Sequence, residues 1–448
     1  MKINLPPHVA FILKSLNSKG HEAFAVGGCV RDSIMGKSPH DWDICTSALP
    51  QQTMECFAGF TVLPSGLQHG TVTLILEKIP YEITTYRIDG EYAGHRRPQQ
   101  VVFTQDIEQD LARRDFTMNA MAYSSGAGLI VPFGGVTSIK NKEIKCVGLA
   151  AARFEEDALR VLRALRFASV LGFKIEENTQ KAIWDKYSLL SEISAERISQ
   201  EFMQMLLGAY VLPVLLQYKE VIAQFIPEIT PMFNMQQHNP HHLYDVWEHT
   251  TRAIAAAPAQ KSVRLAMLFH DMGKPQTFTI GQDGVGHFYK HHRFSAEMAK
   301  SCMRRLRFSN ALIEEVAELV YYHDATILPQ HRYVRKWLNR MGENRLLLLL
   351  EVKRADVLGK GTAEMEENLA EINNIEAVVQ EVLQSQQCFR LKDMAVNGKD
   401  LMSLGLPAGI EIGLLLNALL AKVINEELPN DKQALMQYAQ KKVEENKK

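Results

Sequence analysis

The hydrophobic pattern of the chain changes once, and this change constrains its fold more than any other feature. In the first 145 residues, short runs rich in β-branched and aromatic residues alternate with helical patterns. Four of these runs predict strands, at residues 21–26, 41–45, 71–76 and 81–86. From about Glu155 onward, apolar residues recur at steps of three and four almost without interruption. The sequence therefore predicts an α+β head followed by a long all-helical body.

Composition sets the broad class of the protein. The 448 residues are 46% hydrophobic and 23% charged, which is ordinary globular composition and excludes collagen-like, disordered and small disulfide-stapled proteins. The six cysteines are scattered without a C-x-x-C pair, which favours a reducing cytoplasm. No secretory signal and no membrane-length apolar run is present, and nothing indicates an obligate protein partner. A net charge of −1 excludes a uniformly basic surface but not local basic stripes.

A paired-glycine turn ends the first predicted strand, in the segment G-G-C-V-R-D at residues 27–32. Glycines let the backbone come close to a phosphate, and the start of a following helix offers unpaired N–H donors. Arg31 can pair with phosphate oxygens in a fork. A tight turn without a ligand is the alternative for the two glycines alone.

Two carboxylates follow this turn at Asp41 and Asp43. At i and i+2 of a strand they point to one face, and such a pair is costly unless a divalent cation such as Mg²⁺ bridges it. Glu82 on a neighbouring strand offers a third carboxylate, which could complete the metal site or accept a proton. A solvent-facing glutamate is the competing interpretation of Glu82.

Five motifs in a fixed order resemble the tRNA nucleotidyltransferases, the CCA-adding enzymes and bacterial poly(A) polymerases of the polymerase-β-like superfamily. They are G-G-C-V-R-D (27–32), D-W-D (41–43), H-G-T (69–71), R-R-D-F-T-M-N-A-M-A (113–122) and F-E-E-D-A-L-R-V-L-R-A-L-R-F-A (154–168). The resemblance implies a head with a mixed sheet and helices, followed by helical neck, HD and tail segments. We expect the head at residues 1–145, the neck at 146–235, the HD domain at 236–345 and the tail at 346–448.

The resemblance also implies roles for individual residues. Gly28, Arg31 and Arg114 would contact the incoming nucleotide, and Asp41 and Asp43 would hold Mg²⁺. Asp157 and Arg160 would read the base edge of CTP or ATP, since a carboxylate accepts from an amino group and a guanidinium donates to ring acceptors. Arg163 and Arg166 follow Arg160 at steps of three residues, so the three form an arginine stripe along one helix face, which we also expect near the nucleotide. Three neighbouring positive charges without partners would repel one another, so the stripe predicts phosphate or acid partners.

The polar, glycine-containing segment 87–97 predicts a mobile loop. It resembles the flexible loop that CCA- and A-adding members keep and CC-adding members lack. We therefore expect deletion of residues 89–96 to abolish A addition and spare C addition.

A second constellation lies on predicted helices and contains the segment L-F-H-D-M-G-K at residues 268–274. Separated His and Asp residues on several helices can bind a divalent transition metal. The pattern resembles an HD phosphohydrolase domain, which implies four ligands: His249, His270, Asp271 and Asp324. His292 could extend the site to a second metal.

Together these features predict template-independent addition of CCA to the 3′ end of tRNA from CTP and ATP, with release of pyrophosphate. Two alternatives come from the same family, namely an A-adding-only tRNA nucleotidyltransferase and a poly(A) polymerase. An HD metal-dependent phosphohydrolase and a nucleotide-sensing binding module are alternatives from other classes. The expected partners are tRNA, CTP and ATP.

Overall fold

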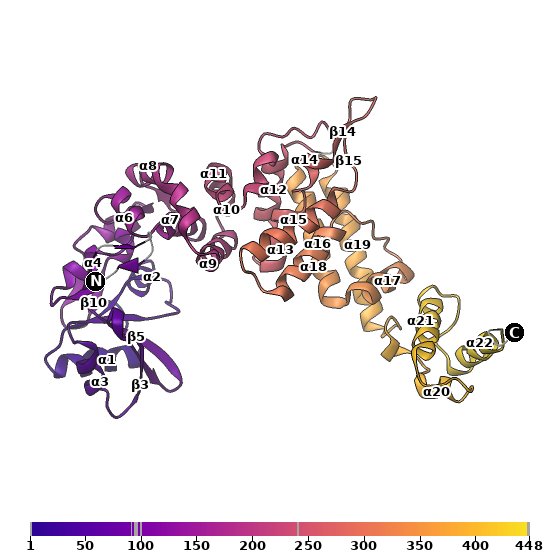
Figure 1. Ribbon diagram of the computed structural model, residues 1–448, viewed down its shortest axis with the longest axis horizontal. Coiled ribbons are helices and arrows are strands. Elements are labelled where there is room, and N and C mark those ends of the chain that lie inside the picture. Colours follow the sequence, from indigo (N-terminus) through magenta and orange to yellow (C-terminus); the bar gives the residue numbers. More distant parts are fainter. Residues whose placement is uncertain (1, 91, 94–96, 99–100, 240–241, 446–448) are drawn as a thin grey trace. The chain divides into compact units, whose positions relative to one another are not determined.

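The computed structural model describes residues 2–90, 92–93, 97–98, 101–239 and 242–445 of the 448-residue chain. It divides into two compact units, Met1–Pro227 and Glu228–Lys448. Figure 1 shows the first unit in indigo to magenta and the second in magenta to yellow. The first unit holds the predicted head and most of the predicted neck.

A seven-stranded sheet forms the head. Its strands, in the order in which they lie side by side, are β11 (Gly128–Ile130), β10 (Ala122–Ser124), β1 (Ala23–Val26), β2 (Asp43–Thr46), β5 (Ile79–Thr85), β4 (Thr71–Leu76) and β3 (Thr61–Gly66). The β2–β5 pair is parallel and the other pairs are antiparallel, so the predicted mixed sheet is confirmed. Each of the four predicted strand runs overlaps one of these strands.

Apolar side chains cover both faces of the central strands, because successive residues of a strand point to opposite sides. On one face, Ala25 and Ile44 pack into a core with Ile12 of helix α1 (Pro7–Ser18). On the other face, Phe24 and Cys45 pack into a second core. The central strands of the sheet are therefore packed on both faces.

Helices surround this sheet and continue beyond it into the neck. They are α1 (Pro7–Ser18), α2 (Gly28–Ile34), α3 (Pro50–Cys56), α4 (Ile107–Ala112), α5 (Gly135–Lys140), α6 (Ala150–Glu156), α7 (Leu159–Leu171), α8 (Glu177–Lys186), α9 (Ala195–Leu206), α10 (Val211–Gln217) and α11 (Lys219–Ala223). Short 3₁₀ helices lie at Leu67–His69, Thr117–Asn119, Tyr187–Glu192 and Pro227–Met232. The arginine-bearing helix α7 packs against α9 of the neck.

The segment predicted as a mobile loop contains paired strands. β6 (Arg87–Asp89) pairs with β9 (Val101–Phe103), and β7 (Tyr92–Ala93) pairs with β8 (Arg97–Pro98). Residues 91, 94–96 and 99–100, between these strands, lie outside the described residues. A third short pair, β12 (Glu143–Ile144) with β13 (Lys174–Ile175), joins the end of the head to the neck.

The second unit is built from helices, as predicted. They are α12 (Val246–Ala256), α13 (Lys261–Phe269), α14 (Lys274–Thr277), α15 (His291–Arg305), α16 (Asn310–Tyr322), α17 (His331–Met341), α18 (Glu343–Lys360), α19 (Met365–Gln384), α20 (Gly398–Met402), α21 (Ile410–Ile424) and α22 (Lys432–Glu445), with a 3₁₀ helix at Leu391–Asp393. Helices α12, α13, α16 and α18 pack on one another in the body of the unit (Figure 1). None of the helices in the described part of the chain is long and apolar enough to cross a bilayer.

One hairpin interrupts this helical body, contrary to the prediction of helices only. Strand β14 (Phe278–Ile280) pairs with β15 (Gly286–Phe288). The turn between them contains Gly284 at φ +77° and Asp283, whose carboxylate accepts a hydrogen bond from the Val285 N–H at 3.0 Å. Glycine and aspartate are the residues that stabilise such turns, and this local chemistry overrides the surrounding helical period.

The expected boundary between residues 345 and 346 does not fit the structure, because it falls inside α18. This helix packs against α12 and α13, so it belongs to the same body as the predicted HD residues. The tail has its own core further along, where Leu401, Leu419 and Leu435 pack together.

Candidate functional site

Strand register places three acidic residues near one another, at the start of β2 and in the middle of β5. Asp43 is the first residue of β2, and Asp41 lies two residues before it. Ile44 of β2 pairs with Ile83 of the parallel strand β5, so the preceding positions, Asp43 and Glu82, lie on the same face. All three carboxylates are exposed. The arrangement offers hard oxygen ligands to a divalent cation.

The ionised form of Asp43 is less favoured than that of a free aspartate. Desolvation by the surrounding protein raises the pKa of Asp43, and the neighbouring Asp41 carboxylate raises it further, against the opposing effect of Arg114. A divalent cation bound here would remove that repulsion, so the residues present fit a magnesium site.

The paired glycines adjoin these carboxylates, because Val26 at the end of β1 pairs with Asp43. Gly27 has φ +84°, a conformation that side chains rarely adopt, and Gly28 begins α2. A Cβ atom on Gly27 would lie 3.1 Å from Nη1 of Arg114. The turn thus needs glycine both for its backbone and for the close approach of this guanidinium.

Buried Asp110 holds the two arginines of the R-R-D motif. Its Oδ1 accepts from Arg113 Nε at 3.0 Å, and its Oδ2 accepts from Arg114 Nη2 at 3.4 Å. The carboxylate is fully buried. Sequence reasoning missed Asp110, although it precedes the two arginines by three and four residues, the spacing of paired charges on a helical turn.

Arg31 is nearly buried and connects the glycine turn with the neck helix. Its Nη1 donates to Asn119 Oδ1 at 2.8 Å, and its Nε donates to Asp32 Oδ1 at 2.9 Å. Its guanidinium carbon lies 5.2 Å from the centre of the Phe167 ring on α7. This position makes Arg31 a link between the predicted phosphate turn and the predicted base-reading helix.

The arginine stripe of α7 has acid partners within the chain, which is one of the two outcomes predicted for it. Arg160 Nη1 lies 2.6 Å from Glu156 Oε2, Arg163 Nη2 lies 2.6 Å from Asp115 Oδ2, and Arg166 Nε lies 2.7 Å from Glu201 Oε2. Arg163 and Arg166 also flank the Phe167 ring. Their contact with a nucleotide stays a prediction.

Asp157 lies between α6 and α7, and it is paired with Arg197 of α9 rather than with Arg160. Arg160 instead donates to Glu156 and to the backbone carbonyl groups of Arg153 and Arg113. The two residues predicted to read the base are therefore each held by a separate partner. Sequence reasoning missed Arg197, which lies 40 residues beyond Asp157.

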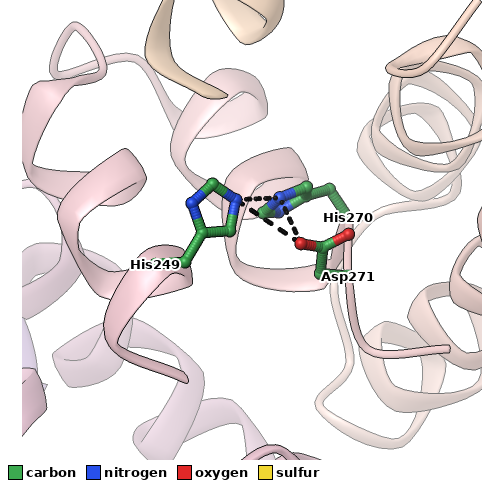
Figure 2. A group of neighbouring side chains, drawn as sticks. All are labelled: His249, His270 and Asp271. Carbon is green, nitrogen blue, oxygen red and sulfur yellow. Dashed lines mark hydrogen bonds and ion pairs between the residues drawn. The ribbon is translucent and has the colours of Figure 1, made fainter. Parts of the chain in front are cut away.

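In the second unit, two histidines and an aspartate converge from α12 and from the end of α13 (Figure 2). His249 Nε2 and His270 Nε2 lie 3.1 Å apart, and Asp271 Oδ2 lies 3.1 Å from His270 Nε2 and 3.4 Å from His249 Nε2. All three residues are buried. The structure thus brings together three of the four predicted HD ligands.

The fourth predicted ligand, Asp324, does not join this group. It is exposed, and it lies with His291 and His292. Asp356 of α18 lies where the Asp324 carboxylate was predicted, beside the two histidines. Its Oδ1 is 3.1 Å from His249 Nε2 and 3.5 Å from His270 Nε2. We call His249, His270, Asp271 and Asp356 the HD cluster. The reason for the difference is that α18 packs directly on α12, whereas Asp324 follows the end of α16.

Two lysines balance the negative charge of the HD cluster. Lys274 Nζ lies 2.7 Å from Asp271 Oδ2, and Lys360 Nζ lies 2.8 Å from Asp356 Oδ2. Burial raises the pKa of Asp271, but His270 and Lys274 outweigh it and hold that pKa well below its usual range. Burial lowers the pKa of His270, but Asp271 and Asp356 outweigh it and raise this pKa to about 9. The His270 ring is therefore protonated at neutral pH, and a bound metal would displace a proton from it.

Family models match three stretches of the chain. Residues 23–145 match the poly A polymerase head domain, residues 172–233 the probable RNA and SrmB-binding site of polymerase A, and residues 288–439 the putative tRNA nucleotidyltransferase domain 2. The CCA-adding enzyme of Geobacillus thermodenitrificans is 33% identical over 432 residues, which are 95% of this chain and 94% of that protein. The CCA-adding enzyme of Lactobacillus helveticus is 31% identical over 434 residues, 95% of each chain.

The chain belongs to the CCA-adding enzyme family. The crystal structure of the Bacillus stearothermophilus CCA-adding enzyme in complex with CTP covers 99% of both chains, with a TM-score of 0.74 and 28% identity. The predicted family and fold class are confirmed, and as a member the chain is a nucleotidyltransferase.

Proposed function

We propose that this CCA-adding family member extends the 3′ end of tRNA with CCA from CTP and ATP, without a nucleic-acid template. The observation that carries the proposal is the register of β1, β2 and β5, which sets Asp41, Asp43 and Glu82 beside the paired-glycine turn. All six cysteines are free, which suits the reducing cytoplasm that we propose as its location.

In this reaction the tRNA 3′-hydroxyl oxygen bonds to the α-phosphorus of the nucleotide, and the bond to pyrophosphate breaks. Mg²⁺ held by Asp41 and Asp43 would supply charge stabilisation on the triphosphate and a lower pKa of the attacking hydroxyl. Glu82 is on the same face of the sheet and could accept the hydroxyl proton. Gly28, Arg31 and Arg114 would orient the phosphates.

Base selection would fall to Asp157 and Arg160, as the resemblance implies. Asp157 has acceptor oxygens for the exocyclic amino group that CTP and ATP share. Arg160 donates to Glu156 and to two carbonyl groups, and these bonds hold its guanidinium at the junction of α6 and α7.

Extension of a tRNA that lacks its terminal CCA tests the proposal, with CTP, ATP or both supplied. The expected product is CCA with both nucleotides, and Asp41→Ala abolishes all addition. Incorporation of A but never C would favour the A-adding-only enzyme, and long A tracts would favour a poly(A) polymerase. Deletion of residues 89–96, of which 91 and 94–96 lie outside the described residues, should remove A addition and spare C addition.

A second function is favoured by the HD cluster, namely metal-dependent hydrolysis of phosphate esters. Its four ligand atoms could hold one divalent transition metal, which would supply a bound hydroxide and a Lewis acid. Hydrolysis of a 2′,3′-cyclic nucleotide should be lost in His270→Ala and Asp271→Ala and retained in Asp41→Ala. Absence of hydrolysis in the unmodified chain over a panel of divalent metals would reject this function and leave nucleotide addition untouched.

A further inference from the structure

Arg31 uses only part of its hydrogen-bonding capacity inside the chain. Its Nε and Nη2 atoms lie 2.9 and 2.8 Å from Asp32 Oδ1, and its Nη1 atom donates to Asn119 Oδ1 at 2.8 Å. A guanidinium has five N–H groups, so two of them remain without a partner in the described part of the chain. A Cβ atom on Gly28 would lie 3.7 Å from Arg31 Nη2. The guanidinium therefore adjoins the glycine turn, where we propose that the triphosphate binds.

The Asn119 amide has one orientation that satisfies both of its neighbours. Its Oδ1 accepts from Arg31, and its Nδ2 donates to Asp115 Oδ1 at 3.2 Å. A guanidinium can only donate and an ionised carboxylate can only accept, so the two partners together fix the amide. Asn119 is 7% exposed and ends the 3₁₀ helix Thr117–Asn119, which packs against α2. Arg31 thus meets an acceptor whose position is fixed by the surrounding protein.

The Phe167 ring restrains the same guanidinium from helix α7. The guanidinium carbon of Arg31 lies over this ring at 5.2 Å from its centre, and that of Arg166 lies over it at 4.1 Å. The face of an aromatic ring is negative and attracts a cation within about 6 Å. Phe167 is only 5% exposed, and it packs edge-on against Phe116 with the ring centres 5.7 Å apart. One fixed ring therefore contacts the predicted phosphate arginine of the head and an arginine of the neck.

We propose that Asn119 and Phe167 are positioning residues, which orient Arg31 toward the phosphates of the incoming nucleotide and of the pyrophosphate product. The inference rests on the proposed nucleotide addition, in which Arg31 orients the phosphates. A long side chain that loses one of these contacts gains rotamer freedom, so fewer of its conformations present the free N–H groups to the glycine turn. Phosphate binding in the head thus depends on α7, the helix that carries Arg160.

Binding of pyrophosphate tests the inference, because this ligand has phosphates but no base. Calorimetric titration of the full chain with pyrophosphate and Mg²⁺ measures the Kd without turnover. We expect Asn119→Ala and Phe167→Leu each to raise this Kd by about three- to tenfold. The KM values for CTP and ATP should rise by the same factor, with the preference among the four nucleotides unchanged, because only the phosphate contacts are altered.

Phe202→Leu is the matched control for the loss of a buried ring. Phe202 is fully buried in the same unit and packs edge-on against the Phe225 ring. We expect it to lower the thermal stability about as much as Phe167→Leu does, but to leave the Kd of pyrophosphate unchanged. An equal rise of this Kd in both variants would overturn the role of Phe167, since loss of core packing would then explain it.

A double-mutant cycle shows whether the two residues act through Arg31. In a chain that carries Arg31→Gln, neither Asn119→Ala nor Phe167→Leu should raise the Kd of pyrophosphate further. A further rise of the same size as in the parent would overturn the inference, as would an unchanged Kd in the two single variants. Failure of the parent chain to extend tRNA, with pyrophosphate binding retained, would instead reject the proposed nucleotide addition.

Discussion

Arg197 of the neck helix α9 binds both carboxylate oxygens of Asp157, with Nη1 at 3.2 Å from Oδ1 and Nη2 at 2.8 Å from Oδ2. Asp157 Oδ1 also accepts a hydrogen bond from the Leu159 N–H at 3.2 Å, at the start of α7. Two-point pairing fixes the plane of a carboxylate as well as its position. The orientation of the predicted base-reading carboxylate is therefore set from a different helix.

The first prediction is that Arg197→Ala weakens nucleotide selection more than it weakens the reaction itself. A free Asp157 carboxylate can rotate, so its hydrogen bond to the amino group of CTP or ATP loses alignment. We expect discrimination against UTP and GTP to fall about tenfold or more, since one well-oriented pair is worth about 1–3 kcal/mol. The measurement is kcat/KM for each of the four nucleotides.

Arg305→Ala is the matched control, because Arg305 makes a similar two-point pair with Glu228 in the other unit. It should leave the four kcat/KM values in their original ratios. Arg197→Lys keeps the charge without the fork and should restore discrimination only in part. Equal losses with all four nucleotides in Arg197→Ala would contradict a role in selection.

The second prediction concerns the backbone of the glycine turn. Gly27→Ala should strain the backbone by about 1–3 kcal/mol and also push against Arg114, whose Nη1 would lie 3.1 Å from the new Cβ. Gly36→Ala is the control, since Gly36 also has positive φ but its Cβ would meet no described atom within 4 Å. We expect similar losses of thermal stability but a much higher KM for CTP and ATP only in Gly27→Ala. An unchanged KM in that variant would contradict the role of this turn in nucleotide binding.

Local patterns in the sequence predicted the head far better than the HD cluster. The strands carrying Asp43 and Glu82 were predictable because a run rich in β-branched and aromatic residues is a local signal. Asp356 lies 85 positions after Asp271, on a helix whose run of five leucines predicts only a buried element. Asp356 reaches the cluster because α18 packs on α12, and the spacing of apolar residues within one helix does not predict which distant helix it will contact. Arg197 was missed for the same reason.

The third prediction follows from the ion pair between buried Asp115 and partly exposed Arg163. Burial raises the pKa of Asp115, but the charge and hydrogen bonds of Arg163 outweigh it and lower the pKa from 3.8 to about 2. A carboxyl group whose pKa is lower in the folded than in the unfolded state stabilises the fold when it is ionised. This contribution is complete above pH 4 and is lost as pH falls toward 2. The shift corresponds to about 2 kcal/mol.

Asp115→Asn should therefore lower the free energy of unfolding by about 2 kcal/mol at pH 7, with a difference that shrinks as pH falls from 4 toward 2. Urea unfolding of the full chain, followed by circular dichroism across this range, measures it. Asp185→Asn removes an exposed carboxylate of the same unit and should show little effect at any pH. A difference from the parent that is independent of pH would mean that Asp115 contributes through packing alone.

The fourth prediction separates the two aspartates that compete for the HD cluster. Asp356→Asn replaces a carboxylate whose Oδ1 lies 3.1 Å from His249 Nε2, whereas Asp324→Asn changes an exposed side chain outside that group. Both substitutions keep the side-chain volume, so folding should be little affected. In chains carrying Asp41→Ala and Asp43→Ala, Asp356→Asn should reduce bound Mn²⁺ by one ion per chain, and Asp324→Asn should leave the count unchanged. Loss of an ion in Asp324→Asn but not in Asp356→Asn would show that Asp324 is the fourth ligand, as the sequence suggested. The segment after α16 would then have to replace α18 beside His249 when metal binds.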